Sequence, residues 1–308
     1  MSNPRKHNAH RLLGTAMVTF SGFLYGMVGY FGIQLFYQGF SMATMLFWRF
    51  LAAALWMLLI ACLSSRRRAK LSGKMMLFTQ LASVGAVSYA SASLYFYLSS
   101  LEIGTGPAMV IFFSFPVFVM LFSLIFKHST MNRFVVVAIL MVVIGLIFLN
   151  GSGSHNLSNW GIFLALIASF SYAIYVYCSQ HSSKKVDSTW LTLFICIGCA
   201  LIFFIYSIVT HTFRVPDTTR AWKDILILGI LATAIPIQLL LNGLKYISSV
   251  NASILSVLEP IMTVVIGILF LNESLAWIQF VGILIILSGA IVIQFEKQPD
   301  FTAKTPLK

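Results

Sequence analysis

Charged residues are scarce in this chain. Of its 308 residues only 9% are charged, whereas 59% are hydrophobic, and the mean hydropathy is +0.92. A soluble domain of this size has too little interior to bury so much apolar surface. Lipid must therefore solvate most of the protein.

Catalytic and energy-coupling motifs are also missing. The sequence has no His-Glu-x-x-His motif, no aspartate pair and no Walker-type phosphate loop. Its four cysteines, Cys62, Cys178, Cys196 and Cys199, fall in or beside apolar runs. Cys196 and Cys199 are three residues apart, but no acid or histidine joins them at ligand spacing, so we interpret the cysteines as small hydrophobic residues. A channel would need a ring or filter of polar groups, which the sparse charges scarcely supply. An enzyme, an ATP-driven pump and a channel are thus disfavoured, and no cofactor or metal is predicted.

Long apolar runs dominate what is present. Each is roughly 17 to 25 residues long, the length that a membrane-spanning helix needs. We count ten of them: Leu12–Phe31, Met42–Leu63, Met75–Leu98, Gly104–Phe126, Phe134–Leu149, Trp160–Ser179, Thr189–Thr210, Ile225–Leu244, Ser249–Leu271 and Leu275–Ile293. The sequence therefore predicts an all-α membrane protein with ten transmembrane helices.

Basic residues in the loops predict the orientation. Lysine and arginine near helix ends resist translocation, and they concentrate before the first run and in the loop at residues 64–74. Both termini are therefore predicted to be cytoplasmic, as residues 1–11 and 296–308. The net charge of +12 reflects this topology, and its spread over short loops argues against binding of nucleic acid.

The two halves of the chain repeat one another. A shift of 144 residues aligns Pro116 with Pro260, and a shift of 147 aligns Tyr25 with Tyr172. Each half, residues 12–150 and 160–295, holds five predicted spans, and an odd number makes the second half enter the membrane from the opposite side. Inverted repeats of this kind are characteristic of secondary transporters that work by alternating access.

Several motifs together resemble a known family. They are Leu46-Phe47-Trp48-Arg49-Phe50, Leu258-Glu259-Pro260-Ile261 and Leu271-Asn272-Glu273-Ser274-Leu275. With the five-plus-five layout they resemble the EamA family of the drug/metabolite transporter superfamily over about residues 12 to 295. The resemblance implies metabolite transport through a central cavity between the halves. It also implies a Gly-Glu-like turn in each half, which Glu273 fits and Ser129 does not.

Glu259 is the most informative residue, because a carboxylate at bilayer depth must be protonated, paired or in contact with water. It shares one helical arc with four hydroxyl residues, Ser249, Ser253, Ser256 and Thr263. This polar stripe is expected to face protein or water and, in the functional interpretation, to line the cavity, which makes Ser256 a candidate for substrate binding. Pro260 beside it, like Pro116 in the first half, predicts a break in the helix. Two interpretations remain open: Glu259 binds a substrate amine or carries a proton, or it is a structural hydrogen-bonding group.

Other polar residues in the predicted helices are weaker candidates for substrate binding. Arg49 either clamps a substrate carboxylate or fulfils a structural role. Tyr25 and Tyr172 occupy equivalent positions in the two halves, with interhelix packing as the alternative. Gln238 and Asn242 need hydrogen-bond partners inside the membrane, and Tyr89 is a candidate of the same kind.

The sequence thus predicts a secondary active transporter for a small molecule, in the inner membrane of a bacterium. One acid and one arginine in the core favour a zwitterionic or amphipathic cargo. The resemblance to the EamA family implies that this cargo is an amino acid or a related compound and that it is exported. The alternative is uptake or exchange of a larger metabolite such as S-adenosylmethionine. Protons are the candidate coupling ion, and the protein is expected to be a monomer or a homodimer.

Overall fold

All regular structure in the described part of the chain is helical. The computed structural model describes residues 4–63, 75–127, 133–150, 157–185, 187–256 and 258–292. Six helical stretches there are long and apolar enough to cross a membrane: His10–Tyr37, Met42–Leu63, Thr105–Ser123, Asn159–Ser179, Ser188–Val209 and Thr219–Gly243. Shorter apolar helices cover Leu258–Phe270 and Trp277–Gly289. The predicted all-α membrane protein is confirmed, while the ten spans in two repeats stay a prediction.

The first half of the chain contains seven helices in its described residues. They are α1 (Pro4–Tyr25), α2 (Val28–Tyr37), α3 (Met42–Leu63), α5 (Met75–Ile103), α6 (Thr105–Phe112), α7 (Phe115–Lys127) and α8 (Arg133–Asn150). Two predicted spans are interrupted here, because α1 and α2 divide the first and α6 and α7 divide the fourth. Such breaks leave backbone groups without intrahelical partners at mid-span, which a membrane protein tolerates only where protein or water covers them.

The second half shows a similar division. Its elements are α9 (Asn159–Lys185), α10 (Ser188–Val209), α11 (Thr219–Leu226), the π-helix η1 (Ile227–Ala234), α12 (Ile235–Gly243), α13 (Ser249–Leu255), α14 (Leu258–Phe270) and α15 (Trp277–Val292). The predicted ninth span is divided into α13 and α14. The eighth runs on through η1, and π-helical turns inside α-helices are frequent at functional sites.

The two predicted helix-breaking prolines lie just after the interruptions. Pro116 is the second residue of α7, and Pro260 is the third residue of α14. Proline lacks an N–H group and has a fixed φ, so it is tolerated in the first turn of a helix, where the N–H has no partner in any case. Each proline therefore marks the start of the second segment.

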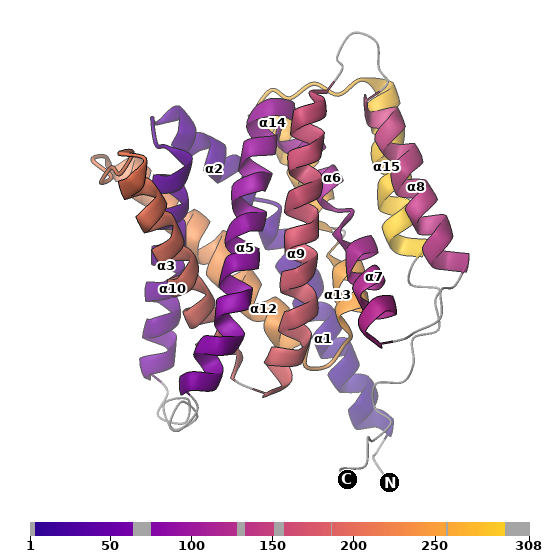
Figure 1. The fold of residues 1–308 in the computed structure, drawn as a ribbon, viewed down its shortest axis with the longest axis horizontal. Helices are drawn as coiled ribbons and strands as arrows, with labels where there is room; N and C mark the ends of the chain where they lie inside the picture. The colour runs from indigo at the N-terminus through magenta and orange to yellow at the C-terminus, as the bar shows by residue number, and fades with distance from the viewer. Residues whose placement is uncertain are drawn as a thin grey trace.

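The helices pack as one bundle (Figure 1). α5 lies against α9, α1 against α12, α3 against α10 and α6 against α14, while α8 and α15 pair at one edge. Small residues allow these close approaches: a Cβ atom added to Gly14 on α1 would lie 3.2 Å from the carbonyl oxygen of Gly243 on α12. The pairs α1–α12, α3–α10 and α6–α14 each join the first half to the second, so any cavity between them is shared.

Polar caps and an ion pair lie on the described connections between helices. The side chain of Asp187 accepts from the Thr189 N–H at 3.0 Å before α10, and that of Thr218 accepts from Ala221 at 3.1 Å before α11. In the connection before α11, Arg214 and Asp217 form an exposed ion pair of 2.6 Å. The hydrogen bond from Arg214 holds the pKa of Asp217 below its ordinary value.

Candidate functional site

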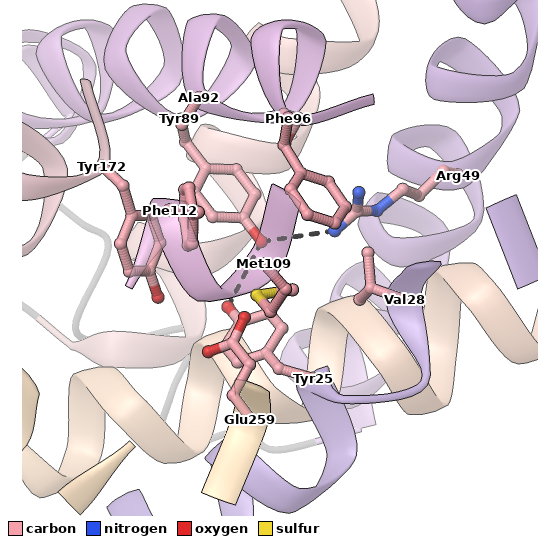
Figure 2. A pocket seen from close by; sticks show the side chains of 11 residues that line it. Tyr25, Val28, Arg49, Tyr89, Ala92, Phe96, Met109, Phe112, Tyr172 and Glu259 are labelled. Carbon is pink, nitrogen blue, oxygen red and sulfur yellow. Dashed lines mark hydrogen bonds between the residues drawn. The ribbon is translucent and has the colours of Figure 1, made fainter. Parts of the chain in front are cut away.

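A small cavity lies in the interior of the bundle, where segments from both halves meet (Figure 2). Its lining comes from α1, α2, α3, α5, α6, α9 and α14: Tyr25, Val28, Arg49, Tyr89, Ala92, Ser93, Phe96, Met109, Phe112, Tyr172 and Glu259. Its volume is about 30 Å³, room for about two or three water molecules. Pockets that hold small-molecule ligands are usually ~300–1,000 Å³. This conformation therefore encloses its polar groups too tightly for a metabolite.

Arg49 is held in place by polar partners from both halves. Its Nε donates to the Thr233 hydroxyl at 2.7 Å, and its Nη2 donates to the Tyr89 hydroxyl at 3.4 Å. The guanidinium also lies 5.1 Å from the centre of the Phe50 ring, a cation–π contact. Arg49 is only 2% exposed, so these contacts replace water and fix its planar donor fork. The side chain does not reach outward to the membrane surface.

The π-helix supplies the partner of Arg49. The Thr233 hydroxyl donates to the carbonyl oxygen of Leu228 at 2.7 Å, five residues earlier in η1. With its hydrogen used in this way, the hydroxyl oxygen is left to accept from Arg49. A Cβ atom on Gly229 would lie 2.7 Å from the carbonyl oxygen of Arg49, so α3 and η1 approach closely. This packing brings the threonine within reach of the arginine.

Three hydroxyl and guanidinium groups form a chain along one side of the cavity (Figure 2). Arg49 donates to Tyr89, and the Tyr89 hydroxyl in turn donates to that of Tyr25 at 3.3 Å. Tyr25 and Tyr89 are both buried, at 4% and 3% exposed. Since each tyrosine hydroxyl in the chain accepts from the group before it, the Tyr25 hydroxyl hydrogen remains to donate across the cavity, where Tyr172 is a hydrogen-bond partner of Tyr25.

Glu259 contributes the carboxylate of the cavity. It stands in the first turn of α14 and is 5% exposed, and its Oε2 has no hydrogen-bond partner among the described residues. A buried carboxylate oxygen without a partner is costly and uncommon in native structures. In Figure 2 the Glu259 carboxyl and the Tyr25 hydroxyl face the same space, with Arg49 on the far side. The cavity thus contains one group of each charge sign.

Tyr172 belongs to an aromatic wall. Its ring centre lies 5.0 Å from that of Phe112, 4.8 Å from that of Phe115 and 6.0 Å from that of Tyr89. Aromatic rings at these separations contribute packing energy beyond simple burial. Tyr25 and Tyr172, aligned by the internal repeat, both line the cavity, and both contact Tyr89, Tyr25 through its hydroxyl and Tyr172 through its ring.

Three of the predicted site residues lie outside this lining. Ser256 donates to the carbonyl oxygen of Ala252 at 3.0 Å, and the amide of Gln238 donates to the Thr189 hydroxyl at 2.9 Å. Asn242 accepts from Lys245 at 3.0 Å. Each therefore has a local or interhelical partner that accounts for its polar group. Ser129 and the orienting basic residues 66–68 lie outside the described residues.

Sequence reasoning missed Thr233 and gave Tyr89 little weight. The internal repeat contained a signal for both, because the shift of 144 residues that aligns the prolines also aligns Tyr89 with Thr233. Both hydroxyls accept a hydrogen bond from Arg49. Met109 and Phe112 gave no such signal, since apolar residues of a membrane helix look alike in sequence.

The fold and the site define a helical membrane protein with one charged cavity shared between its halves. The chain belongs to the EamA-like transporter family, whose model matches residues 12–151 and again residues 159–295. This confirms the resemblance drawn from the motifs around Arg49, Glu259 and Glu273. A family of transporters also favours a protein that is not an enzyme.

Individual relatives are more distant. An uncharacterised transporter of Archaeoglobus fulgidus is 28% identical over 133 residues, which cover 43% of this chain and 47% of the relative. The threonine/homoserine exporter RhtA of Escherichia coli is 28% identical over 211 residues, covering 67% of this chain and 66% of the exporter. The chain thus spans about half of the archaeal relative and about two thirds of RhtA. A solved crystal structure with 13% identity matches 91% of this chain and 96% of its own with a TM-score of 0.66, which supports the fold.

Proposed function

We propose that this protein is a secondary active transporter that exports a small zwitterionic metabolite, an amino acid or a related compound, across a bacterial inner membrane. The single observation that carries the proposal is the pairing of Arg49 and Glu259 in one buried cavity. A guanidinium fork suits a carboxylate, and a carboxylate with a free oxygen suits an ammonium group. A zwitterion satisfies both at once, whereas a multiply charged anion would leave Glu259 opposed to like charge.

Alternating access follows from the size of the cavity. About 30 Å³ is available here, roughly a tenth of the smallest usual ligand pocket. A substrate therefore enters and leaves only when helices of the two halves separate. Two inverted repeats of five spans supply such a movement, and the separate match of the family model to each half supports this arrangement.

The packing of the helices also supports the repeat. The contact of α5 with α9 has a counterpart in that of α12 with α1, and α3, α6 and α8 each pack on the corresponding helix of the other half. The direction of transport and the class of cargo are supported by the similarity to RhtA, which is a threonine/homoserine exporter. Termini in the cytoplasm follow from the basic loops.

Glu259 is proposed as the coupling group. Burial disfavours a charged carboxylate, so its proton and the ammonium group of a substrate compete for the same oxygen atoms. Exchange of one for the other couples proton entry to substrate exit. Ser93 and the hydroxyls of Tyr25, Tyr89 and Tyr172 are the neutral polar groups of the lining, and they can contribute hydrogen bonds to a substrate side chain.

Counterflow in proteoliposomes tests the proposed cargo. Vesicles are loaded with one unlabelled compound from a panel of amino acids and S-adenosylmethionine, and uptake of the same labelled compound is measured. We expect saturable counterflow with small neutral amino acids. Counterflow with S-adenosylmethionine alone would support the larger cargo, and flux that neither saturates nor shows counterflow would contradict a carrier.

A further inference from the structure

A second carboxylate, Glu273, closes one end of the helix pair that flanks the cavity. Its Oε1 accepts from the Thr105 N–H at 2.6 Å and from the Thr105 hydroxyl, and its Oε2 accepts from the Gly106 N–H at 2.8 Å. These donors are the first residues of α6, where backbone N–H groups lack helical partners and attract negative charge. Glu273 itself lies on the connection between α14 and α15. The contact therefore joins the two halves.

The chain is shaped around this carboxylate. A Cβ atom added at Gly267 would lie 2.5 Å from its Oε2 and would displace the carboxylate, and one added at Gly106 would crowd the same atom at 3.0 Å. Gly104 precedes α6 with a φ of +87°, a conformation that other residues rarely adopt. Asn272 has a φ of 55°, and the Glu273 N–H donates to the Gly267 carbonyl oxygen at 3.1 Å. This turn ends α14 and directs the side chain back to α6.

The two elements that Glu273 joins also line the cavity. Met109 and Phe112 on α6 stand against Glu259 on α14, and the two helices pack on each other. Opening of the cavity toward the α14–α15 connection requires that these helices separate at that end. Such a movement breaks every hydrogen bond that α6 donates to Glu273.

We infer that Glu273 is a positioning residue that keeps the cavity closed on the side of the α14–α15 connection. The inference rests on the proposed alternating access. The carboxylate holds α6 against α14 in the closed state and releases it when this side opens. Loss of the contact shifts the population toward the state that is open on this side, because the open state lacks the contact and loses nothing.

The test is the sidedness of thiol labelling in the full-length protein, in a variant whose four native cysteines are replaced by serine. The cavity residue Ser93 is changed to cysteine, and a membrane-impermeant maleimide is added from each side of oriented vesicles. We expect Glu273→Gln and Gly267→Ala to raise the labelling rate from the α14–α15 side about tenfold and to lower it from the other side. A tenfold change corresponds to ~1.4 kcal/mol.

Glu102→Gln is the matched control, because Glu102 is an exposed acid near the end of α5, on the same rim, and we expect wild-type labelling from it. Unchanged labelling in Glu273→Gln and Gly267→Ala, or an equal rise from both sides, would contradict the inference and leave Glu273 only the role of a helix cap. If Glu273→Gln does not fold, Thr105→Val removes only the hydroxyl donor and should give a rise of about threefold on one side. Labelling needs no substrate, so this result is independent of the proposed cargo.

Discussion

Glu259 and Glu273 stand at the two ends of α14, and the protein treats them in opposite ways. Glu273 receives three hydrogen bonds from the start of α6, whereas the Oε2 of Glu259 has no partner among the described residues. A carboxylate whose hydrogen-bonding capacity is used by the backbone is committed to one conformation. One that is buried and unsatisfied costs stability and is available to a ligand or a proton. The difference separates a group that holds one conformation of the protein from one that is available to bind what is transported.

The largest expected effect comes from Arg49, the opposite charge in the cavity of Glu259. We expect Arg49→Lys to reduce counterflow about 100-fold, because an ammonium group cannot donate to Thr233 and Tyr89 and still present a fork to a carboxylate. The reduction is measured from initial rates of counterflow over a range of substrate concentrations. Arg214→Lys on an exposed connection is the control, and wild-type rates for both variants would remove Arg49 from the site.

Thermal stability sharpens the comparison between the two acids. We expect Glu273→Gln to lower the melting temperature in detergent, since one of its two acceptor oxygens becomes an NH₂ group, a loss of ~1.5–3 kcal/mol. Glu259→Gln should leave the melting temperature unchanged or raise it, because a neutral amide costs less to bury. Equal losses in the two variants would show that both carboxylates are structural.

A change at Tyr25 tests the cavity that contains Glu259, with a smaller expected effect. Tyr25→Phe removes the hydroxyl that accepts from Tyr89 and keeps the ring. We expect counterflow to fall about fivefold, the effect of one neutral hydrogen bond. Tyr37→Phe, on an exposed tyrosine at the end of α2, is the matched control. A fall of the same size in the control would point to a general loss of stability.

The smallest expected effect is that of changing Asp217, an exposed acid that serves as a reference for the buried Glu259 and for Glu273. Because Arg214 lowers its pKa, the pair stabilises the folded protein only above the ordinary pKa of aspartate, and this stabilisation is lost as the pH falls through the lowered value. Exposed pairs contribute little. We expect the melting temperature of Asp217→Asn at neutral pH to match that of the wild type within error. A clear decrease would mean that this connection also holds the helices together.

Much of the fold could be predicted from the sequence, because hydropathy and proline placement are local signals. Arg49, Glu259, Tyr25 and Tyr172 stood out as polar or repeated residues, and the structure places all of them on one cavity. In the sequence the same reasoning also selected Gln238, Asn242 and Ser256. The structure shows that their polar groups bond to partners outside the cavity.

The partners of charged groups could not be predicted. Glu273 was visible as part of a turn, but its acceptor role depends on backbone N–H groups 167 and 168 residues away. The position of the Thr233 hydroxyl likewise depends on the π-helical register of η1. An apolar run of sequence contains no signal that predicts a π-helix. Contacts between distant segments are set by packing, and packing is not encoded in any local pattern.

The pH dependence of transport by the Glu259→Gln variant tests the central claim most directly. Counterflow and net export of an accepted amino acid are measured from pH 5 to 9 in the wild type, in Glu259→Gln and in the control Glu102→Gln. We predict that the wild type and the control share one pH profile, and that Glu259→Gln loses both its pH dependence and its net export against a gradient. A wild-type profile in Glu259→Gln would contradict the assignment of this carboxylate to coupling.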